Sequence, residues 1–507
     1  MKIISKFKII PYLIIMSFLL VAVMATKVFT GLVTPYFVAI YAVVLVGFSV
    51  VYFLVVLKKS IEKIYLAAGL FLGLTFMLVI PPNGAADENN HYYKCFDFAN
   101  VFWGKELVED SKYHYLRDCD ANLNLDKVIS LDDYLYIEEI FWDRADSSEL
   151  KQVYVDDVTY ENKDLIYYIP AILGIILGRL LGMGGIGTYM VARLFLFGTY
   201  MFITYWALKK IPVFKREFTV LLLMPSVISR VASVTYDTLL MACIFWFISN
   251  VIYYMKKQTV ITIKDAILMI IAGIGLTVGK GGAYIPFLLL MFLIPKKCFG
   301  ERIKYPLVVA VSIGISFLAY CLCNFSLFAD VIGSASSIEN DLLWTEEEGY
   351  TIKYILTHPK QSIIVLVNTF MRFGYKWFGE TIGDGYGWLQ VYVSPFLIVA
   401  YTILIIFSTI SREDEEIFTG KQRVFMGIVA ILSCILVVLS MWIFWTPLSY
   451  ELIVGVQGRY FIPMLILIVA AIKSKNWIMK KDVTPAILIV SVMITSLNAF
   501  NILTAVR

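Results

Sequence analysis

The stretch EKIYLAAGLFLGLTFMLVIPPNGAADENNHYY, residues 62–93, contains the transition around which this sequence is organised. It begins with an apolar run that is long enough to cross the hydrocarbon core of a bilayer, which takes about 20 residues. The proline pair at 81–82 then stops the helix, because proline lacks the amide hydrogen that a helix interior needs. Two carboxylates and an imidazole follow at once, those of Asp87, Glu88 and His91. A span that ends in ionisable groups predicts a site at the membrane surface.

The composition places the whole chain in a membrane. Of its 507 residues, 60% are hydrophobic and 16% are charged, and the mean hydropathy is +0.78. Soluble chains are usually about 45–50% apolar and about 25% charged. These values exclude a soluble enzyme of several domains and a disordered chain. A net charge of +4 over this length excludes a nucleic-acid binder, which would carry a basic footprint.

Apolar runs of membrane-spanning length recur along the chain, which predicts an all-α polytopic membrane protein. The clear spans are 9–28, 33–57, 62–81, 188–208, 217–233, 235–255, 305–328, 389–409, 424–446, 459–472 and 483–503. Two shorter runs, 266–279 and 283–295, flank Lys280 and form either two short spans or one re-entrant hairpin. We therefore expect about 13 spans.

Lys and Arg gather in short loops, which we place in the cytoplasm together with the N-terminus, because short cytoplasmic loops are enriched in these residues. These loops are 58–63, 209–216, 256–264, 296–304, 412–423 and 473–481. A single span then fits between the outer loop after residue 81 and Lys209. We accordingly expect 165–183 to form an amphipathic or half-inserted helix on the outer face. The same parity keeps 361–388 outside and puts the C-terminus outside.

Charge is distributed unevenly between the two sides of the membrane. Residues 83–164 carry a net charge of −12, whereas the rest of the chain carries +16. A solvated loop must be polar, so solubility alone accounts for much of this pattern. Even so, 83–164 is longer than a connection needs. We expect an N-terminal transmembrane hairpin over 1–60, and a second domain over 61–507 whose extracytoplasmic loop is 82–187.

The carboxylates that follow the third span are the first candidates for chemistry. A carboxylate at a half-dry interface can be tuned to act as a general base, and Asp87 begins such a group with Glu88 and His91. Asp87 can also be read as the N-cap of a helix that begins at Glu88. The three side chains together resemble a weak divalent-metal site, but no metal-binding spacing recurs elsewhere.

The second candidate is Arg459, which opens an outer-face span in the run Gln457-Gly458-Arg459-Tyr460. An arginine at the head of a helix opposes the helix dipole. A bound anion such as a lipid phosphate would offset that cost through a bidentate contact. The alternative is an interfacial arginine that snorkels beside an aromatic neighbour. We treat Arg459, Gln457 and Tyr460 as candidate substrate-binding residues.

Two further candidates lie on the same predicted face. Lys280 sits at the outer end of a short span, where the charge rule for cytoplasmic loops would not put it. It is not part of a nucleotide-binding loop, because no Ser or Thr follows it. Arg230 and Asp237 flank a tight outer turn and are candidate substrate contacts, although they could simply pair with each other. The convergence of these positions carries more weight than any single motif.

The seven cysteines do not form a disulfide framework. Cys95 and Cys119 are the two that fall in the large outer loop. We expect them to lie close enough to form a bridge.

The order of these motifs resembles a bacterial membrane family known as domain of unknown function 2142. Its opening motif, Pro-Pro-Asp-Glu-Pro-x-His-Phe, is similar to Pro81-Pro82 followed by Asp87-Glu88-x-x-His91-Tyr92. Further stretches agree from about residue 62 to 472: Tyr168-Ile169-Pro170, Gly178-Arg179-Leu180-Leu181-Gly182, Ala192-Arg193-Leu194, Met224-Pro225, Ser233-Val234-Thr235-Tyr236-Asp237, Lys280, Tyr284-x-Pro286, and Gln457 to Pro463. This chain departs from the motif by inserting Asn83 to Ala86 and by placing Asn89 where the family has proline.

That family in turn resembles the GT-C glycosyltransferases, membrane enzymes with a catalytic acid in their first large outer loop. The resemblance implies a GT-C-like fold with juxtamembrane helices, a polyprenyl-phosphate sugar donor and a cell-envelope glycan acceptor. It implies Asp87 as general base, with Glu88 and His91 as its partners or metal ligands. It also implies Lys280 and Arg459 as contacts of the donor phosphate. Two other classes stay open, namely a flippase or transporter of lipid-linked saccharides and a non-catalytic subunit of a polysaccharide assembly complex.

Overall fold

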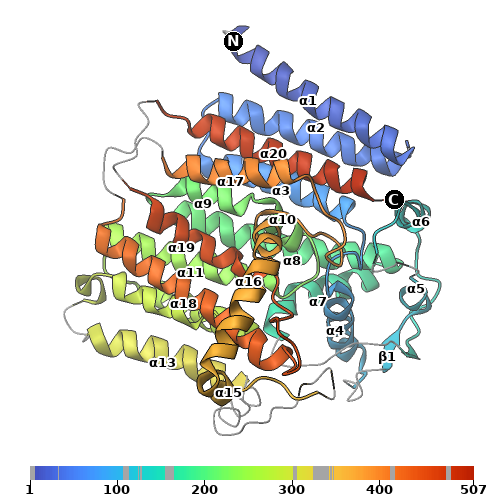
Figure 1. Cartoon of the computed structure of the whole chain (residues 1–507). Coiled ribbons are helices and arrows are strands. Elements are labelled where there is room, and N and C mark those ends of the chain that lie inside the picture. Colours follow the sequence, from blue (N-terminus) through green and yellow to red (C-terminus); the bar gives the residue numbers. More distant parts are fainter. Residues whose placement is uncertain are drawn as a thin grey trace.

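The structure is a computed structural model that describes residues 6–31, 33–106, 113–123, 125, 128–154, 165–300, 305–323, 342, 345, 347–410, 417–474 and 481–506. Most of these residues are helical, and the long helices lie side by side with a lobe of short elements at one end (Figure 1). Seven of the described helices are long and apolar enough to cross a membrane. The chain is therefore a mostly helical, multi-pass membrane protein. The total of about 13 spans stays a prediction.

Three antiparallel helices begin the chain: α1 (Lys6–Thr30), α2 (Pro35–Val56) and α3 (Ile61–Val79). The first of them packs along α2 and along the last helix, α20 (Thr484–Ala505). One hydrophobic core continues from α2 into the rest of the bundle. The domain boundary expected near residue 60 stays a prediction, but no break in packing marks it.

The centre of the bundle contains a broken helix, whose two halves are α9 (Lys215–Leu222) and α10 (Pro225–Val231). The continuous helices before and after it are α8 (Gly185–Lys210) and α11 (Asp237–Lys257). The predicted span 217–233 thus divides between α9 and α10, because Pro225 cannot continue the first helix. Neighbouring helices satisfy the freed backbone. Tyr401 donates to the carbonyl of Val220 at 2.7 Å, and Thr495 donates to that of Leu223 at 2.9 Å. Irregular backbone at membrane depth is tolerated when it is buried and satisfied in this way.

The two short apolar runs form a hairpin of unequal helices, α12 (Ile263–Val278) and the 3-10 helix η4 (Ile285–Leu293). The short turns η3 (Lys280–Gly282) and η5 (Lys296–Phe299) close its two ends. A hydrogen bond of 2.7 Å from the backbone amide of Ile261 to the backbone carbonyl of Cys298 joins the base of the hairpin. A 3-10 helix rises about 2.0 Å per residue against about 1.5 Å for an α-helix, so η4 spans about 18 Å and α12 about 24 Å. Lys280 lies at the tip.

The remaining helices complete the bundle and cross its outer end. They are α13 (Tyr305–Cys323), α15 (Ile352–Thr357), α16 (Pro359–Ile382), α17 (Pro395–Thr409), α18 (Gly420–Trp445), the 3-10 helix η6 (Gly458–Phe461) and α19 (Ile462–Ile472). Helix α16 runs across the direction of its neighbours in Figure 1 rather than along it. It is also absent from the helices with the composition of a span. The expectation that 361–388 stays outside the membrane remains a prediction.

The acidic outer loop folds into a small lobe. Its elements are α4 (Glu88–Asn100), η1 (Val101–Trp103), β1 (Tyr113–Leu116), α5 (Asp118–Ala121), α6 (Leu131–Ile140) and β2 (Lys151–Tyr154). The two strands pair antiparallel, with Tyr113 opposite Tyr154. This short two-stranded ribbon lies within a described chain that is otherwise mostly helical, as expected of an all-α membrane protein. The lobe packs on the bundle through its own apolar cluster, which includes Phe96 and Ile175.

Helix α7 (Leu165–Leu180) lies antiparallel against the first half of α8. The two backbones approach closely at Gly174, where an added Cβ would stand 2.7 Å from the Cα of Ala192. The opposite face of α7 exposes an apolar stripe at helical spacing that includes Ile166, Ile169 and Leu173. Such a stripe is typical of a helix that rests against lipid, as expected for a half-inserted helix.

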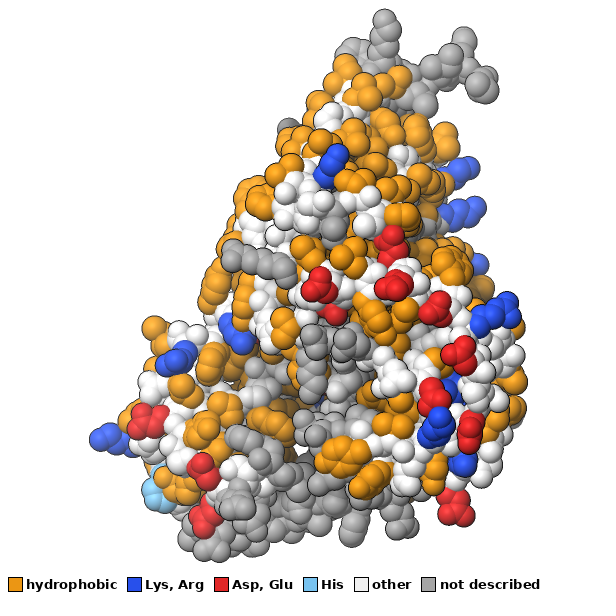
Figure 2. All heavy atoms as spheres, turned by 90° about the vertical axis from the view of Figure 1, so that its right-hand side faces the viewer, with side chains coloured by type: hydrophobic (Ala, Val, Ile, Leu, Met, Phe, Trp, Pro, Cys, Tyr) orange, Lys and Arg blue, Asp and Glu red, His pale blue; other side chains and the backbone are white. Residues whose placement is uncertain are grey.

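The basic loops meet at the end of the bundle opposite the lobe. Lys215 pairs with Glu62, Lys210 with Asp265 at 2.5 Å, and Lys473 with Glu217 at 2.5 Å. Helix α1 begins at that end, and α20 finishes beside the lobe (Figure 1). Figure 2, which looks onto the lobe end, shows acidic and basic side chains over its wide part, whereas the narrow part near α1 and α2 is mainly hydrophobic with a few Lys or Arg side chains. The odd number of spans stays a prediction.

The expected disulfide is wrong for this structure. Cys95 and Cys119 are both free thiols. Cys95 is fully buried in the apolar cluster between α4 and α7, whereas Cys119 belongs to α5, next to Gly185 at the start of α8. Two positions in one loop need not face each other once that loop folds around its own core.

We predict that Glu149 in the lobe and Lys209 at the end of α8 lie on opposite sides of the membrane. Single Glu149→Cys and Lys209→Cys variants, in a background without native cysteines, should label differently with a membrane-impermeant maleimide. The first should label in intact cells and the second after permeabilisation. Labelling of both from the same side would contradict the topology.

Candidate functional site

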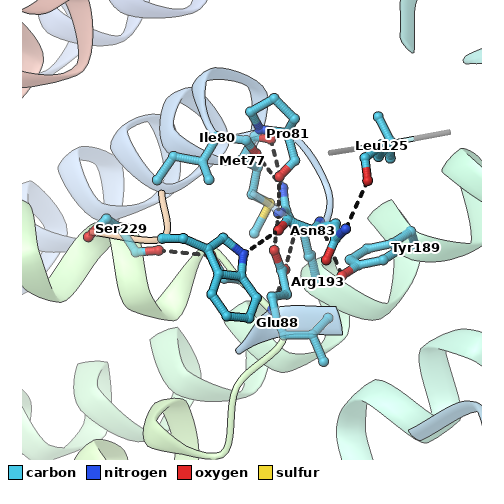
Figure 3. Close-up of polar contacts among 12 residues, drawn as sticks. Met77, Ile80, Pro81, Asn83, Glu88, Leu125, Tyr189, Arg193 and Ser229 are labelled. Atoms are coloured by element: carbon cyan, nitrogen blue, oxygen red, sulfur yellow. Dashed lines mark hydrogen bonds and ion pairs between the residues drawn. The ribbon is translucent and has the colours of Figure 1, made fainter. Parts of the chain in front are cut away.

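One buried guanidinium organises the end of α3. Arg193 of α8 donates to the backbone carbonyls of Met77, Ile80 and Pro81 at 2.7–3.1 Å (Figure 3). The last carbonyls of a helix have no partners within the helix, and the fixed fork of an arginine can satisfy several of them at once. The arginine therefore caps the span where the proline pair ends it.

The same guanidinium holds Glu88. Its two contacts with the carboxylate measure 2.8 Å and 2.6 Å, and neither side chain is meaningfully exposed. Oxygen Oε1 of Glu88 also accepts from the backbone amide of Val234 at 2.8 Å. Both carboxylate oxygens are thus occupied and closed to solvent. The geometry assigns Glu88 to holding three chain segments together, which corrects the expectation of a catalytic partner or metal ligand.

The inserted residues before Asp87 are held as firmly as the rest. Asn83 has a positive φ of 69°, a conformation that asparagine adopts more readily than most residues. The side-chain nitrogen Nδ2 of Asn83 donates to the backbone carbonyl of Leu125 at 2.9 Å (Figure 3). The backbone carbonyl of Asn83 accepts from the indole nitrogen of Trp388 at 3.2 Å. The backbone amide of Asn83 also donates to Tyr189 at 3.3 Å. This departure from the family motif therefore lengthens the loop without loosening it.

Asp87 faces the opposite way from Glu88 and pairs with Arg459. The contact between Oδ2 and Nη2 is 2.6 Å, and it joins residues 372 positions apart in the chain. Asp87 stands in a left-handed conformation with φ of 64°, and its side chain makes no capping bond to α4. The N-cap alternative is therefore not what the structure contains. Non-glycine residues in this conformation are strained, and such residues cluster at functional sites.

The environment of Asp87 keeps it ionised. Burial by itself would raise the pKa of its carboxyl, but the Arg459 guanidinium lowers it by more, and the pKa falls below its usual range. The side chain is still 39% exposed, so a ligand can reach it. In this arrangement Asp87 is an anion paired with a cation.

His91 is a neutral imidazole that forms a hydrogen bond close to Asp87. Burial lowers the pKa of its imidazole well below the ordinary value. Its Nδ1 lies 2.6 Å from the hydroxyl of Tyr168 on α7, which links α4 to α7. The ring also meets the edge of Tyr236 at 5.3 Å between centroids. His91 thus positions the lobe against the bundle.

The remaining predicted residues surround the Asp87–Arg459 pair. Lys280, at the tip of its hairpin, lies 3.1 Å from Asp237 and over the ring of Tyr460 at 4.4 Å. The alternative pairing of Arg230 with Asp237 is not formed. Arg230 and Arg459 instead line two adjoining cavities together. Four motifs from distant parts of the chain therefore meet at one place.

The larger of these cavities lies between α10, the end of α16 and the turn before η6. Gln457 lines it as expected. Sequence reasoning missed Ser226 and Ser229 of α10, and Glu380 and Asp384 at the end of α16. The signal that could have found the last two is the run Gly379-Glu380-Thr381-Ile382-Gly383-Asp384-Gly385, two acids among glycines in a segment predicted to lie outside.

The weak metal hypothesis finds no support in this geometry. Within the described parts of the chain, no three side chains of the His, Cys, Asp and Glu types gather closely enough to hold a metal ion. Asp87, Glu88 and His91 each turn to a different partner. Cationic side chains, not a carboxylate cluster, dominate the surroundings of Asp87.

The comparison with protein families agrees with the resemblance seen in the motifs. Residues 70–468 match the family described as predicted membrane protein (DUF2142). The chain belongs to this family. No curated protein and no solved structure has a significant match to it. Membership in DUF2142 establishes a membrane protein, and the likeness to GT-C enzymes stays a proposal.

We predict that Glu88→Gln destabilises the protein strongly, because it leaves the buried Arg193 charge without its counterion. Breaking a buried pair in this way typically costs about 3–5 kcal/mol. The melting temperature of the detergent-purified variant should drop markedly. The substitution Asp118→Asn, in the exposed Asp118–Lys151 pair, is the matched control and should melt near wild type. An unchanged melting temperature for Glu88→Gln would contradict the structural role assigned to the pair.

Proposed function

We propose that this protein transfers a sugar from a polyprenyl-phosphate donor to a cell-envelope glycan at the extracytoplasmic face of the cell membrane. The observation that carries the proposal is the Asp87–Arg459 pair, with Arg230 and Lys280 beside it at the lobe end of the bundle. A sugar transfer of the inverting type needs a base for the acceptor hydroxyl and cations for the departing phosphate. The pair brings one of each into contact.

The cations are suited to a lipid phosphate. Arg459 is 8% exposed, and its guanidinium can grip a phosphate with two parallel hydrogen bonds. Negative charge grows on the phosphate as the sugar leaves, and fixed cations in a dry site stabilise that charge in the transition state. Lys280 adds a third positive charge from the hairpin tip. The hydrophobic surface of the bundle provides the environment that a polyprenyl chain needs.

The ion pair suggests how donor and acceptor are coupled. In the empty protein Arg459 neutralises Asp87, so the carboxylate is a poor base. A donor phosphate competes for the same guanidinium and weakens its hold on the carboxylate. Asp87 then becomes available to accept the proton of the acceptor hydroxyl, while the phosphate departs toward Arg459 and Arg230. The base is thereby most active when the donor is bound.

Two features bear on the competing classes. A transporter of lipid-linked saccharides would need ionisable groups along a path through the membrane. The cluster lies instead at one end of the bundle, and the buried charges around Glu217 at the other end pair with one another. A non-catalytic subunit would have no need of a strained, ion-paired carboxylate beside a cavity. A transfer assay with the purified protein separates the glycosyltransferase from both other classes.

We predict that Asp87→Asn abolishes transfer while donor binding persists. Removing a positioned base typically costs about 10²–10⁴-fold in rate. Donor binding should be unchanged or tighter, because the asparagine no longer competes for Arg459. The test measures transfer of a radiolabelled sugar from its polyprenyl-phosphate donor by the purified protein in nanodiscs. Asp118→Asn, which breaks the exposed Asp118–Lys151 pair, is the control and should transfer at the wild-type rate.

We predict a different pattern for Arg459→Ala. This substitution should weaken donor binding as well as transfer, because it removes a contact made in the ground state and the transition state alike. The same nanodisc preparation measures both quantities. Near wild-type transfer by Asp87→Asn would show that the base is another residue. Undiminished donor binding by Arg459→Ala would remove the phosphate site.

A further inference from the structure

Charges of both signs line the larger cavity. Arg230 and Arg459 belong to its lining, and so do Glu380 and Asp384. A bound phosphate would explain the two arginines. It would not explain the two carboxylates, because they would repel it. The carboxylates must therefore contact a different, uncharged part of the ligand.

Three polar atoms that belong to residues of this cavity lie buried without a hydrogen-bond partner in the described structure. They are Oε1 of Glu380, Oε1 of Gln457 and Nε of Arg459. Glu380 as a whole is 5% exposed, and the nearest cation, Nζ of Lys376, stands 3.8 Å from Oε1, too far for a hydrogen bond. Buried polar atoms are nearly always hydrogen-bonded, so a group of unsatisfied ones around a cavity points to a missing ligand.

The residues that carry these atoms are held rigidly. The other oxygen of Glu380 accepts from the backbone amide of Gly458 at 2.6 Å, and Thr381 donates to the carbonyl of Gly458 at 2.8 Å. Gly458 has no room for a side chain, because an added Cβ would stand 2.2 Å from the carbonyl oxygen of Trp377. Gln457 and Arg459 are thus locked to the end of α16 from both sides. Preorganised groups of this kind lose little entropy when a ligand binds.

A sugar ring matches this combination of partners. Its hydroxyls donate to carboxylate and amide oxygens and accept from guanidinium nitrogens, so one uncharged ligand can satisfy all three atoms. Neither a second phosphate nor an apolar chain could do so. Burial raises the pKa of Glu380, which fits a site for neutral hydroxyls better than one for a cation. The cavity also adjoins Arg459, where the phosphate would be held.

We propose that Glu380 and Gln457 bind hydroxyl groups of the sugar carried by the donor, and that this side of the cavity selects which sugar is accepted. The inference rests on the proposed function, because it places the sugar next to the phosphate held by Arg459. It adds a subsite formed by the end of α16 and the turn before η6. Asp384, fixed by a 2.8 Å bond from the amide of Val393, forms the next part of the same wall.

The test compares binding of undecaprenyl phosphate with binding of undecaprenyl phosphate that carries glucose, galactose, mannose or N-acetylglucosamine. The full-length protein in nanodiscs should bind at least one of the glycosylated lipids more tightly than the bare lipid phosphate. Glu380→Gln keeps the shape and the acceptor for Gly458 but turns a donor toward the cavity. It should weaken the preferred glycosylated lipid about tenfold relative to the bare lipid, roughly the effect of losing one hydrogen bond to a charged group, whereas the bare lipid should bind no more weakly than to the wild type. Glu451→Gln, an exposed carboxylate of the preceding loop, is the control.

The outcomes separate this inference from the proposed function. Loss of bare-lipid binding in Arg459→Ala together with an unchanged sugar preference in Glu380→Gln overturns the subsite and leaves the phosphate site standing. A wild-type protein that binds all glycosylated lipids no better than the bare one also overturns the subsite. Failure to bind any of the five lipids would instead refute the proposed function. If Glu380→Gln does not fold, Gln457→Ala carries the same test, with the same expected loss of preference.

Discussion

The buried ion pair between Arg193 and Glu88 is the interaction on which the outer face depends. It caps the carbonyl end of α3, fixes the first residue of α4, and reaches the amide of Val234 before α11. A charge sealed from water in this way is costly unless every donor and acceptor is used, and here they are. The fully hydrogen-bonded pair offsets its desolvation cost and holds three chain segments together at one point. That convergence sets the place where the lobe begins.

Two adjacent carboxylates consequently take opposite roles. Glu88 turns inward and has a structural role as the partner of Arg193. Asp87 is in a strained conformation that turns its side chain outward to Arg459. The strain is sustained by the anchoring of its neighbour and of the loop before it. A rigid support beneath an accessible, ion-paired carboxylate is the arrangement that a binding or catalytic site needs. The half-buried pair would be free to rearrange, while the buried one would not.

Much of the architecture follows from local features of the chain. Apolar runs predicted the long helices, and the charge of short loops predicted which ends of the bundle lie together. Parity singled out 165–183 and 361–388, and their placement outside the membrane stays a prediction. The disulfide expectation failed because sequence proximity of Cys95 and Cys119 says nothing about the core around which their loop folds. The break between α9 and α10 was missed because hydropathy does not register one proline in a buried run.

The sequence by itself determined that this is a membrane protein, which positions carry ionisable groups at the surface, and to which family the motifs point. These properties depend on composition, helix-stopping residues and spacing, all of which are local. Tertiary structure alone decided that Asp87 meets Arg459, that Glu88 is sealed against Arg193, and that Glu380 faces the same cavity. Such pairings depend on how helices hundreds of residues apart pack, and neither periodicity nor charge pattern encodes the partner of a side chain.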